Sequence, residues 1–153
     1  MPIRAKVSTA TCPSIALATA TLIPLTEEAQ AALGGSEVQL AHFPFRVGRE
    51  KRGAALWWPG RINRRVRDTQ GTNDLYLVEQ RDHPHISRDH FLIERAHSRF
   101  FLVDRGSLCG TSVAGTRLGG YRRGGRAELR HGEVIVIGTS TSPYVYRFDI
   151  AGN

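Results

Sequence analysis

A chain of 153 residues has the length of one domain and can bury a core without the help of disulfides or metals. Its composition, 41% hydrophobic and 23% charged with a net charge of +7, is that of a globular protein and excludes wholesale disorder. No apolar run reaches the roughly 18–20 residues of a membrane-spanning helix, and two cysteines cannot build a disulfide framework or, unaided, a zinc site.

The first predicted element is a strand over residues 15–23. The larger residues at 15, 17 and 23 lie on one face, and the alanines at 16, 18 and 20 lie on the other. This period of two is typical of strands. Arg4 and Lys6 precede it as basic residues precede the apolar part of a signal peptide, but its threonines favour the strand. We therefore expect an N-terminal extension over residues 1–14 and a cytoplasmic protein.

A short helix is predicted next, near residues 26–33. Thr26 can cap the first turn by accepting a hydrogen bond, and the two glutamates that follow suit the positive end of the helix dipole. Gly34 can adopt the left-handed conformation that ends a helix. A helix this short is marginal alone, so we expect it to pack on a sheet.

Short apolar runs separated by turn residues predict further strands. The clearest is 144–150, where aromatic and aliphatic residues alternate strictly with Val145, Arg147 and Asp149. Residues 134–137 are β-branched throughout, which predicts a strand buried on both faces. Other runs of strand length are 38–40, 43–47, 75–78, 91–94 and 100–103. Such regular spacing predicts an all-β sandwich or barrel.

Positive charge is concentrated in two segments. Residues 46–67 carry eight basic residues against Glu50 alone, and residues 117–132 carry five arginines against Glu128 alone. Of the 21 basic residues in the chain, 19 are arginines. The planar guanidinium fork binds carboxylates and phosphates at two points, so we expect anionic partners.

Three turn-rich segments between predicted strands combine glycine or serine with arginine or other polar groups. They are Gly48-Arg49, Ser87-Arg88-Asp89-His90 and Gly106-Ser107-Leu108-Cys109-Gly110-Thr111. Loops at one end of a sandwich converge, so we expect these segments to line one shallow cleft. Hydroxyl, backbone N–H and guanidinium donors together are suited to hold a tetrahedral anion.

The order and spacing of these segments resemble the forkhead-associated (FHA) domain family. The run 132–138, Gly-Glu-Val-Ile-Val-Ile-Gly, and Asn73-Asp74-Leu75 also match its pattern. The resemblance spans roughly residues 15–150 and implies a β-sandwich of about eleven strands, with a basic loop insert at about 50–72. It also implies a non-enzymatic adaptor for a threonine-phosphorylated protein, such as a Ser/Thr kinase or its substrate in bacterial signalling, with no cofactor, metal or membrane contact.

The resemblance implies a role for each motif residue. Arg49 would contact the phosphate or the peptide main chain, Ser87 would donate its hydroxyl to a phosphate oxygen, and Arg88 would add charge at the rim. The residues implied to hold the loops in shape are Gly48, His90 and Gly110. A phosphothreonine carries about −1.5 to −2 charges and three strong acceptor oxygens, which arginine and hydroxyl donors can satisfy.

One position pair departs from the family pattern. Where the family commonly has Thr-Asn before the glycine of the third loop, this chain has Leu108-Cys109. Leucine cannot hydrogen-bond a phosphate, and a thiol cannot replace an amide that grips the ligand main chain on two sides. Losing one hydrogen bond to a charged group costs about 1.5–3 kcal/mol, so we expect affinity to fall tenfold or more, or the loop to bind another ligand.

The basic insert allows several interpretations. Arg52, Arg64 and Arg65 are candidate auxiliary phosphate contacts, and the Trp57-Trp58 pair is suited to stack on bases or to dock a protein. A solvated loop anchored by one tryptophan is the plainest alternative. Two other functions stay open. The insert allows a nucleic-acid or polyanion binder acting through the 46–67 loop, and Leu108 and Cys109 allow a degenerate FHA scaffold subunit that binds partners independently of phosphorylation.

The histidines and the loop cysteine invite other chemistry. His83, His85 and His90 have no cysteine or carboxylate partner in a ligand pattern, so we expect no metal site. Cys109 lies in a basic, glycine-flanked loop, where a thiol is either redox-sensitive or a plain small hydrophobe. No nucleophile motif accompanies the serine.

Overall fold

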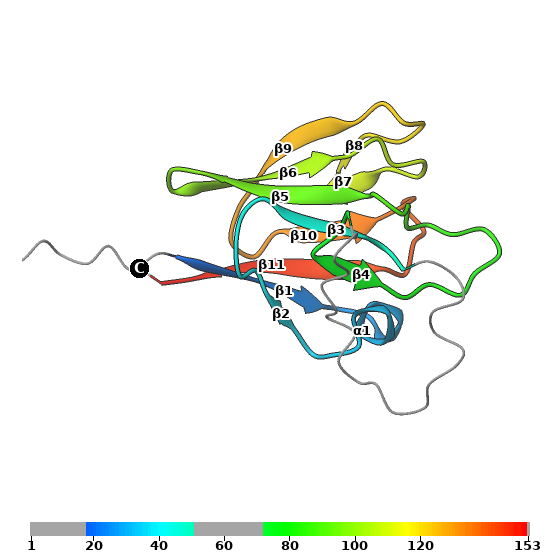
Figure 1. Cartoon of the computed structure of the whole chain (residues 1–153), viewed down its shortest axis with the longest axis horizontal. Helices are drawn as coiled ribbons and strands as arrows, with labels where there is room; N and C mark the ends of the chain where they lie inside the picture. The colour runs from blue at the N-terminus through cyan, green and yellow to red at the C-terminus, as the bar shows by residue number, and fades with distance from the viewer. Residues whose placement is uncertain (1–17, 51–71, 153) are drawn as a thin grey trace, which may run out of the picture.

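Two β-sheets packed face to face form the part of the chain that this computed structural model describes, residues 18–50 and 72–152 (Figure 1). One sheet contains, in spatial order, β2 (Val38–Gln39), β1 (Thr19–Pro24), β11 (Val145–Ala151), β10 (Val134–Ile137), β7 (Thr111–Val113) and β8 (Thr116–Leu118). The other contains β4 (Leu75–Leu77), β3 (Phe45–Arg49), β5 (Phe91–Ala96), β6 (Arg99–Asp104) and β9 (Gly125–Leu129). These eleven strands within the described ranges confirm the predicted sandwich.

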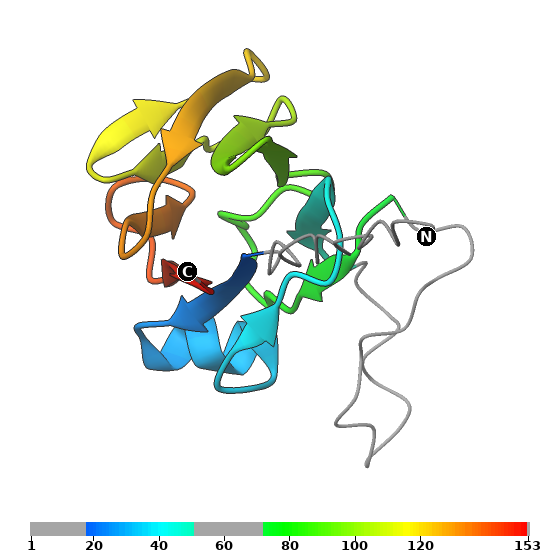
Figure 2. The ribbon, with the colours of Figure 1, turned by 90° about the vertical axis from the view of Figure 1, so that its left-hand side faces the viewer.

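The core lies between the two sheets, which Figure 2 shows facing each other. Tyr146 and Phe148 of β11 are buried, as their period of two predicts. In β10 only Ile135 and Ile137 are fully buried, while the alternate valines are half-buried. The prediction that residues 134–137 are buried on both faces is therefore wrong, because a two-layer sandwich covers only one face of each sheet.

The predicted helix is confirmed as α1 (Glu27–Leu33). The hydroxyl oxygen of Thr26 accepts the N–H of Ala29 at 3.1 Å, and Gly34 ends the helix with φ of 73°. The buried hydroxyl of Tyr146 donates to the carbonyl of Ala29 at 3.0 Å, and burial raises its pKa above its usual range. The helix is thus fixed to the sheet beneath it, and no helix in the described ranges is long and apolar enough to cross a membrane.

Most neighbouring strands are antiparallel, but β3 and β4 are parallel. At the right-hand end in Figure 1, four features gather: the last residue of β3, the β4–β5 loop (78–90), the β6–β7 loop (105–110) and the β8–β9 loop (119–124). This loop end carries the motif residues.

Candidate functional site

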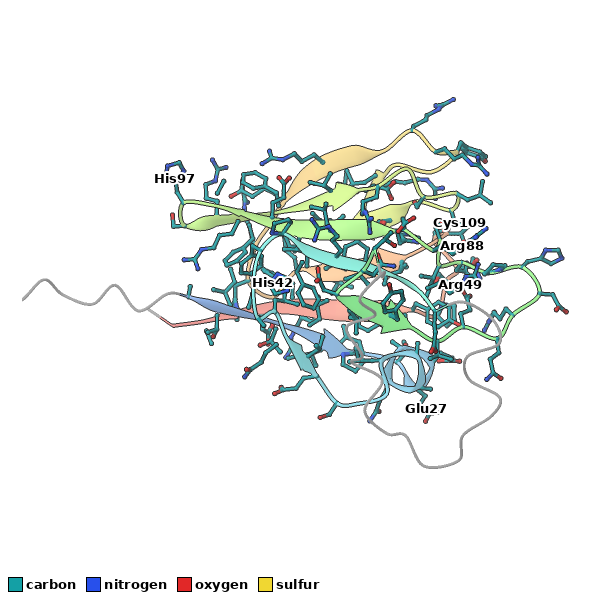
Figure 3. All side chains as sticks on the ribbon, viewed as in Figure 1. Glu27, His42, Arg49, Arg88, His97 and Cys109 are labelled. Carbon is teal, nitrogen blue, oxygen red and sulfur yellow. The ribbon has the colours of Figure 1, made fainter. Side chains whose placement is uncertain are left out.

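The three turn-rich segments come together at this loop end, as expected. Arg49, Arg88 and Cys109 lie close to one another in Figure 3. Backbone groups join the segments: the N–H of Arg49 donates to the carbonyl of Ser87 at 2.9 Å, and the N–H of Leu108 donates to the hydroxyl oxygen of Ser87 at 3.0 Å. The serine loop therefore lies between the other two segments and is bonded to both.

Arg49 ends β3 with its side chain along the β4–β5 loop. Its Nε donates to the carbonyl of Ile86 at 2.8 Å, which fixes the direction of the half-buried side chain. Neither of its terminal nitrogens has a hydrogen bond to a residue of the described ranges. A guanidinium that is held at Nε and unpaired at its fork is suited to bind an anion.

Gly48 lets the β4–β5 loop approach β3 closely. A methyl group at this position would overlap the carbonyl oxygen of Arg88 and lie 2.5 Å from Nδ2 of Asn73. Asn73 in turn donates through Nδ2 to that same carbonyl at 2.7 Å. Glycine is required here because the space is filled by main chain and by a side chain bonded to it, neither of which can move aside cheaply.

The hydroxyl of Ser87 has a fixed position and an unused proton. Its oxygen accepts from the N–H of Leu108, and no acceptor within the described ranges takes its hydrogen. The Ser87 backbone is held on both sides, because its carbonyl accepts from Arg49 and its N–H donates to Nδ1 of His90 at 2.8 Å. The O–H is therefore free to donate toward solvent or a ligand.

His90 is fully buried and connects the second segment to the third. Its Nδ1 accepts the N–H of Ser87, so the ring hydrogen is on Nε2, which donates to the carbonyl of Gly110 at 2.9 Å. Burial lowers the pKa of His90 below its usual 6.5, against smaller opposing effects of the Gly110 carbonyl, Asp104 and Glu79. The neutral ring is thus the form that fits this structure.

Because of His90, we expect the free energy of unfolding to decrease as the pH is lowered below about 6.5. Its folded pKa is lowered, so the unfolded chain binds a proton first as pH drops below about 6.5. The stabilisation is complete above about pH 6.5 and is lost below it, by at most about 1.4 kcal/mol per pH unit, until the folded pKa is reached. Urea unfolding at pH 7.5, 6.5 and 5.5 measures this slope.

The matched comparison uses two glutamine variants from the same loop. His90→Gln is expected to be less stable than wild type at pH 7.5. Between pH 6.5 and 5.5 its free energy of unfolding should decrease much less than that of wild type. His83→Gln replaces an exposed histidine and is expected to keep the wild-type slope. Equal slopes in wild type and His90→Gln would mean that another group causes the decline.

Buried carboxylates hold both loops, and sequence reasoning missed them. Glu79 is 5% exposed, and its two oxygens accept the N–H groups of His85 (2.9 Å) and Ile86 (2.8 Å). It therefore fixes the residues that lead into Ser87. In the sequence Glu79 directly follows the predicted strand 75–78 and looks like an ordinary surface acid.

Asp104 does the same for the β6–β7 loop. Oδ1 accepts the N–H groups of Gly106 (3.0 Å) and Ser107 (2.9 Å). Oδ2 accepts the hydroxyls of Ser107 (2.6 Å) and Thr111 (3.2 Å). The Ser107 oxygen then accepts the N–H of Gly110 at 3.0 Å, so one buried carboxylate and one buried serine define the turn.

Arg105 is a further residue that the motifs did not indicate. It donates through Nη1 to Oδ1 of Asn73 at 2.6 Å, and its Nη2 forms an ion pair with Asp89 at 3.2 Å. Asn73 is buried and also bonds the carbonyl of Arg88, so the two residues brace the serine loop from outside. The position of Asn73 within the family-like Asn-Asp pair was its sequence signal.

The two departing residues lie at the loop surface. Leu108 presents a side chain that is 56% exposed, while its backbone N–H bonds the Ser87 hydroxyl. Cys109 is half-buried, with its thiol 3.8 Å from the carbonyl of Pro84 and its own carbonyl bonded by Arg117. Arg88 is exposed at the rim with its carbonyl bonded inward.

This arrangement can bind a tetrahedral anion. The Arg49 fork and the Ser87 O–H, neither of them bonded to an acceptor within the described ranges, lie in joined segments of the loop end with the exposed Arg88, and donors of these types are suited to a tetrahedral anion. The proposed auxiliary contacts Arg52, Arg64 and Arg65 lie outside the described residues. Within the described ranges, no group of three His, Cys, Asp or Glu residues could hold a metal ion.

Comparisons with known proteins agree with this geometry. A family model described as FHA domain matches residues 45–138. The kinase-interacting FHA domain of kinase associated protein phosphatase from Arabidopsis is 20% identical with a TM-score of 0.58, and the match covers 89% of this chain and 96% of that one. FHA-1 of Mycobacterium tuberculosis Rv1747 is 22% identical with a TM-score of 0.53, and the match covers 89% of this chain and 99% of that one.

A third similar structure is that of Mycobacterium tuberculosis EmbR in complex with a low affinity phosphopeptide. The identity is 19% with a TM-score of 0.53, and the match covers 88% of this chain but 25% of EmbR. The present chain thus spans about a quarter of the EmbR chain. At these identities the three structures establish a shared fold, and no curated protein matches the sequence.

Proposed function

The chain belongs to the FHA domain family, and we propose that it is a non-catalytic adaptor that binds threonine-phosphorylated proteins. The proposed binding surface is the loop end that carries Arg49, Ser87 and Arg88, with Leu108 and Cys109 of the β6–β7 loop beside them. The partner is a Ser/Thr kinase or one of its substrates. Phosphopeptide binding at this fold is supported by the EmbR complex, whose structure contains a phosphopeptide.

The observation that carries the proposal is the pair of unused donors on neighbouring loops. The Arg49 fork and the Ser87 O–H lack acceptors among the described residues, and a 2.9 Å backbone hydrogen bond joins their two segments. A phosphate offers three acceptor oxygens to such donors. Each charge-assisted hydrogen bond is about twice as strong as a neutral one, so two or three of them are enough to read the phosphorylation state.

The geometry of His90 supports a binding role rather than catalysis. A serine nucleophile needs a base within hydrogen-bond reach of its hydroxyl. Here Nδ1 of His90 accepts from the backbone N–H of Ser87, and Nε2 faces the carbonyl of Gly110. Both ring nitrogens are thus engaged with main chain, and the histidine shapes the loop instead of activating the serine.

Titration with matched peptides tests the proposal. We expect a phosphothreonine peptide from a library to bind in fluorescence anisotropy at least about tenfold more tightly than its unphosphorylated twin. A phosphoserine version with the same flanks measures the contribution of the threonine methyl group. Equal binding of the phosphorylated and unphosphorylated twins would contradict the proposal and favour a partner that binds independently of phosphorylation.

We also expect Cys109→Asn to strengthen phosphopeptide binding by about tenfold. An asparagine at this loop position can donate and accept through its amide, which the thiol does only weakly. The surrounding turn is held by Asp104 and Ser107, so it keeps its shape when residue 109 changes.

Cys109→Ser is the control for this substitution. It replaces the thiol with a hydroxyl of similar size and supplies no amide, so its affinity is expected to stay within about threefold of wild type. Unchanged or weaker binding of Cys109→Asn would show that the loop reaches its ligand in another way. The same anisotropy titration gives both values.

A further inference from the structure

The β8–β9 loop, residues 119–124, lies beside the candidate site and has no role in the function argued so far. Its backbone is joined to the β6–β7 loop: the N–H of Tyr121 donates to the carbonyl of Leu108 at 2.8 Å, and that of Arg122 donates to the carbonyl of Ser107 at 3.0 Å. Because the N–H of Leu108 bonds the Ser87 hydroxyl, an unbroken chain of contacts connects Ser87, Leu108 and Tyr121.

Two residues in this chain of contacts carry exposed apolar side chains. Within the described ranges, the large apolar residues that are most exposed are Tyr121 (77%), Leu108 (56%) and Leu25 (45%). The first two are paired through their backbones next to the serine, whereas Leu25 lies beside α1. We call Leu108 and Tyr121 the apolar ledge. An exposed apolar pair beside a polar site is suited to contact a ligand side chain.

Unpaired positive charge surrounds the apolar ledge. Arg122 and Arg123 in the loop have no carboxylate partner within the described ranges, and neither does Arg88 across the site. The arginines further along the same basic cluster are paired: Arg126 with Glu94, and Arg130 with Glu128. Among the described residues, the arginines of the cluster 117–132 without a carboxylate partner are Arg117, which donates to the carbonyl of Cys109, and Arg122 and Arg123 in the loop, where they favour an acidic ligand.

The β8–β9 loop, which carries Tyr121, has a defined conformation. Gly119 has φ of 60°, and a methyl group there would overlap the carboxylate of Asp104, the residue that shapes the β6–β7 loop. Tyr121 and Arg122 are both left-handed, with φ of 50° and 62°. The N–H of Arg123 donates to the carbonyl of Gly120 at 3.1 Å, so Tyr121 and Arg122 are the central residues of a tight hydrogen-bonded turn that has positive φ at both positions.

We propose that the apolar ledge and the arginines beside it, Arg122 and Arg123, form a second contact surface that reads the flank of the phosphorylated peptide. This inference rests on the proposed function and adds its specificity: the partner has a large apolar side chain within a few residues of the phosphothreonine, with acidic residues beside it. Backbone contacts place the ledge one loop away from the Ser87 hydroxyl, within reach of a peptide held there.

The test is a phosphothreonine peptide series in which each flanking position is varied in turn to leucine, alanine, glutamate and lysine. For wild type we expect leucine to exceed alanine by about tenfold at one flanking position, and glutamate to exceed lysine at others. Tyr121→Asn, which suits a left-handed position, and Leu108→Ser are each expected to reduce the leucine preference to about threefold or less.

Arg122→Ser combined with Arg123→Ser is expected to remove the glutamate preference and to leave the leucine preference in place. The matched control is Leu25→Ser, an exposed leucine away from the ledge, which should keep both preferences. Circular dichroism and melting curves establish that each variant is folded.

The outcomes separate the two proposals. The ledge proposal is wrong if phosphopeptides bind tightly without a leucine preference. It is also wrong if that preference persists in both Tyr121→Asn and Leu108→Ser. In either case the proposed adaptor function is unaffected. If no phosphopeptide binds better than its unphosphorylated twin, the proposed function fails and the ledge falls with it. Binding of a single-stranded oligonucleotide in place of peptide, lost in the arginine variant, would overturn the peptide assignment of this surface.

Discussion

Arg49→Ala is expected to weaken phosphopeptide binding by at least about 30-fold while the domain stays folded. The substitution removes the unpaired guanidinium fork, and truncating one partner of a charge-assisted pair costs about 2–5 kcal/mol. Its cost to stability is smaller, because within the described ranges the Arg49 side chain makes one hydrogen bond, from Nε to the carbonyl of Ile86. Losing that bond is worth about 0.5–1.5 kcal/mol.

Two further variants separate charge from geometry at this site. Arg49→Lys keeps the positive charge but loses the fork, so its affinity should fall between wild type and Arg49→Ala. Arg88→Ala removes an exposed rim charge and should weaken binding only about threefold, more at low salt than at high salt. A fold that collapses on Arg49→Ala would make this arginine a structural residue, and unchanged affinity would place the anion elsewhere.

Gly48→Ala is expected to destabilise the domain by more than about 3 kcal/mol and to abolish peptide binding. The added methyl group would overlap the carbonyl of Arg88, which Asn73 holds in place from the other side. Relief requires β3 and the serine loop to separate, and this breaks the bond between Arg49 and Ser87 as well. Urea unfolding measures the free-energy loss.

Gly35→Ala is the matched control. A methyl group at Gly35 meets only the carbonyl of Glu37, at an ordinary 3.9 Å, so we expect a change within about 0.5 kcal/mol. If Gly48→Ala were as stable as Gly35→Ala, the close packing of β3 against the serine loop would be wrong.

Elements with a strong local pattern could be predicted from the sequence. β11 alternates aromatic and polar residues, and α1 has a cap at each end, so both were found with nearly their observed bounds. β8 and β9 lie at sheet edges, and of their residues only Leu129 is fully buried, which leaves no apolar period to read. Their existence followed only from the family resemblance, which implied about eleven strands.

The motif residues of the site were also predictable, but their supports were not. Gly48, Ser87 and His90 stand in motifs with fixed spacing, whereas Glu79 and Asp104 look like ordinary surface acids in the sequence. Their burial depends on loops that fold over them and aim backbone N–H groups at their oxygens. A buried carboxylate of this kind becomes visible only when the tertiary structure places several donors around it.

The same reason explains why the apolar ledge could not be foreseen. Leu108 reads as a lost hydrogen bond, and Tyr121 reads as one aromatic residue in a glycine-rich turn. Only the tertiary structure shows that a backbone hydrogen bond joins the two residues next to Ser87 and that both side chains are exposed. What the sequence presents as a defect in one motif is, in three dimensions, half of an exposed apolar pair.

A double-mutant cycle on Arg49 and Ser87 tests the central claim, that these two residues hold the same phosphate. Affinities for one phosphothreonine peptide are measured for wild type, Arg49→Ala, Ser87→Ala and the double variant. Two residues that contact the same phosphate are expected to show a coupling energy of about 0.5–3 kcal/mol. The loss of binding free energy in the double variant should therefore be smaller than the sum of the two single losses. Strictly additive losses, or unchanged binding in Ser87→Ala, would contradict the account.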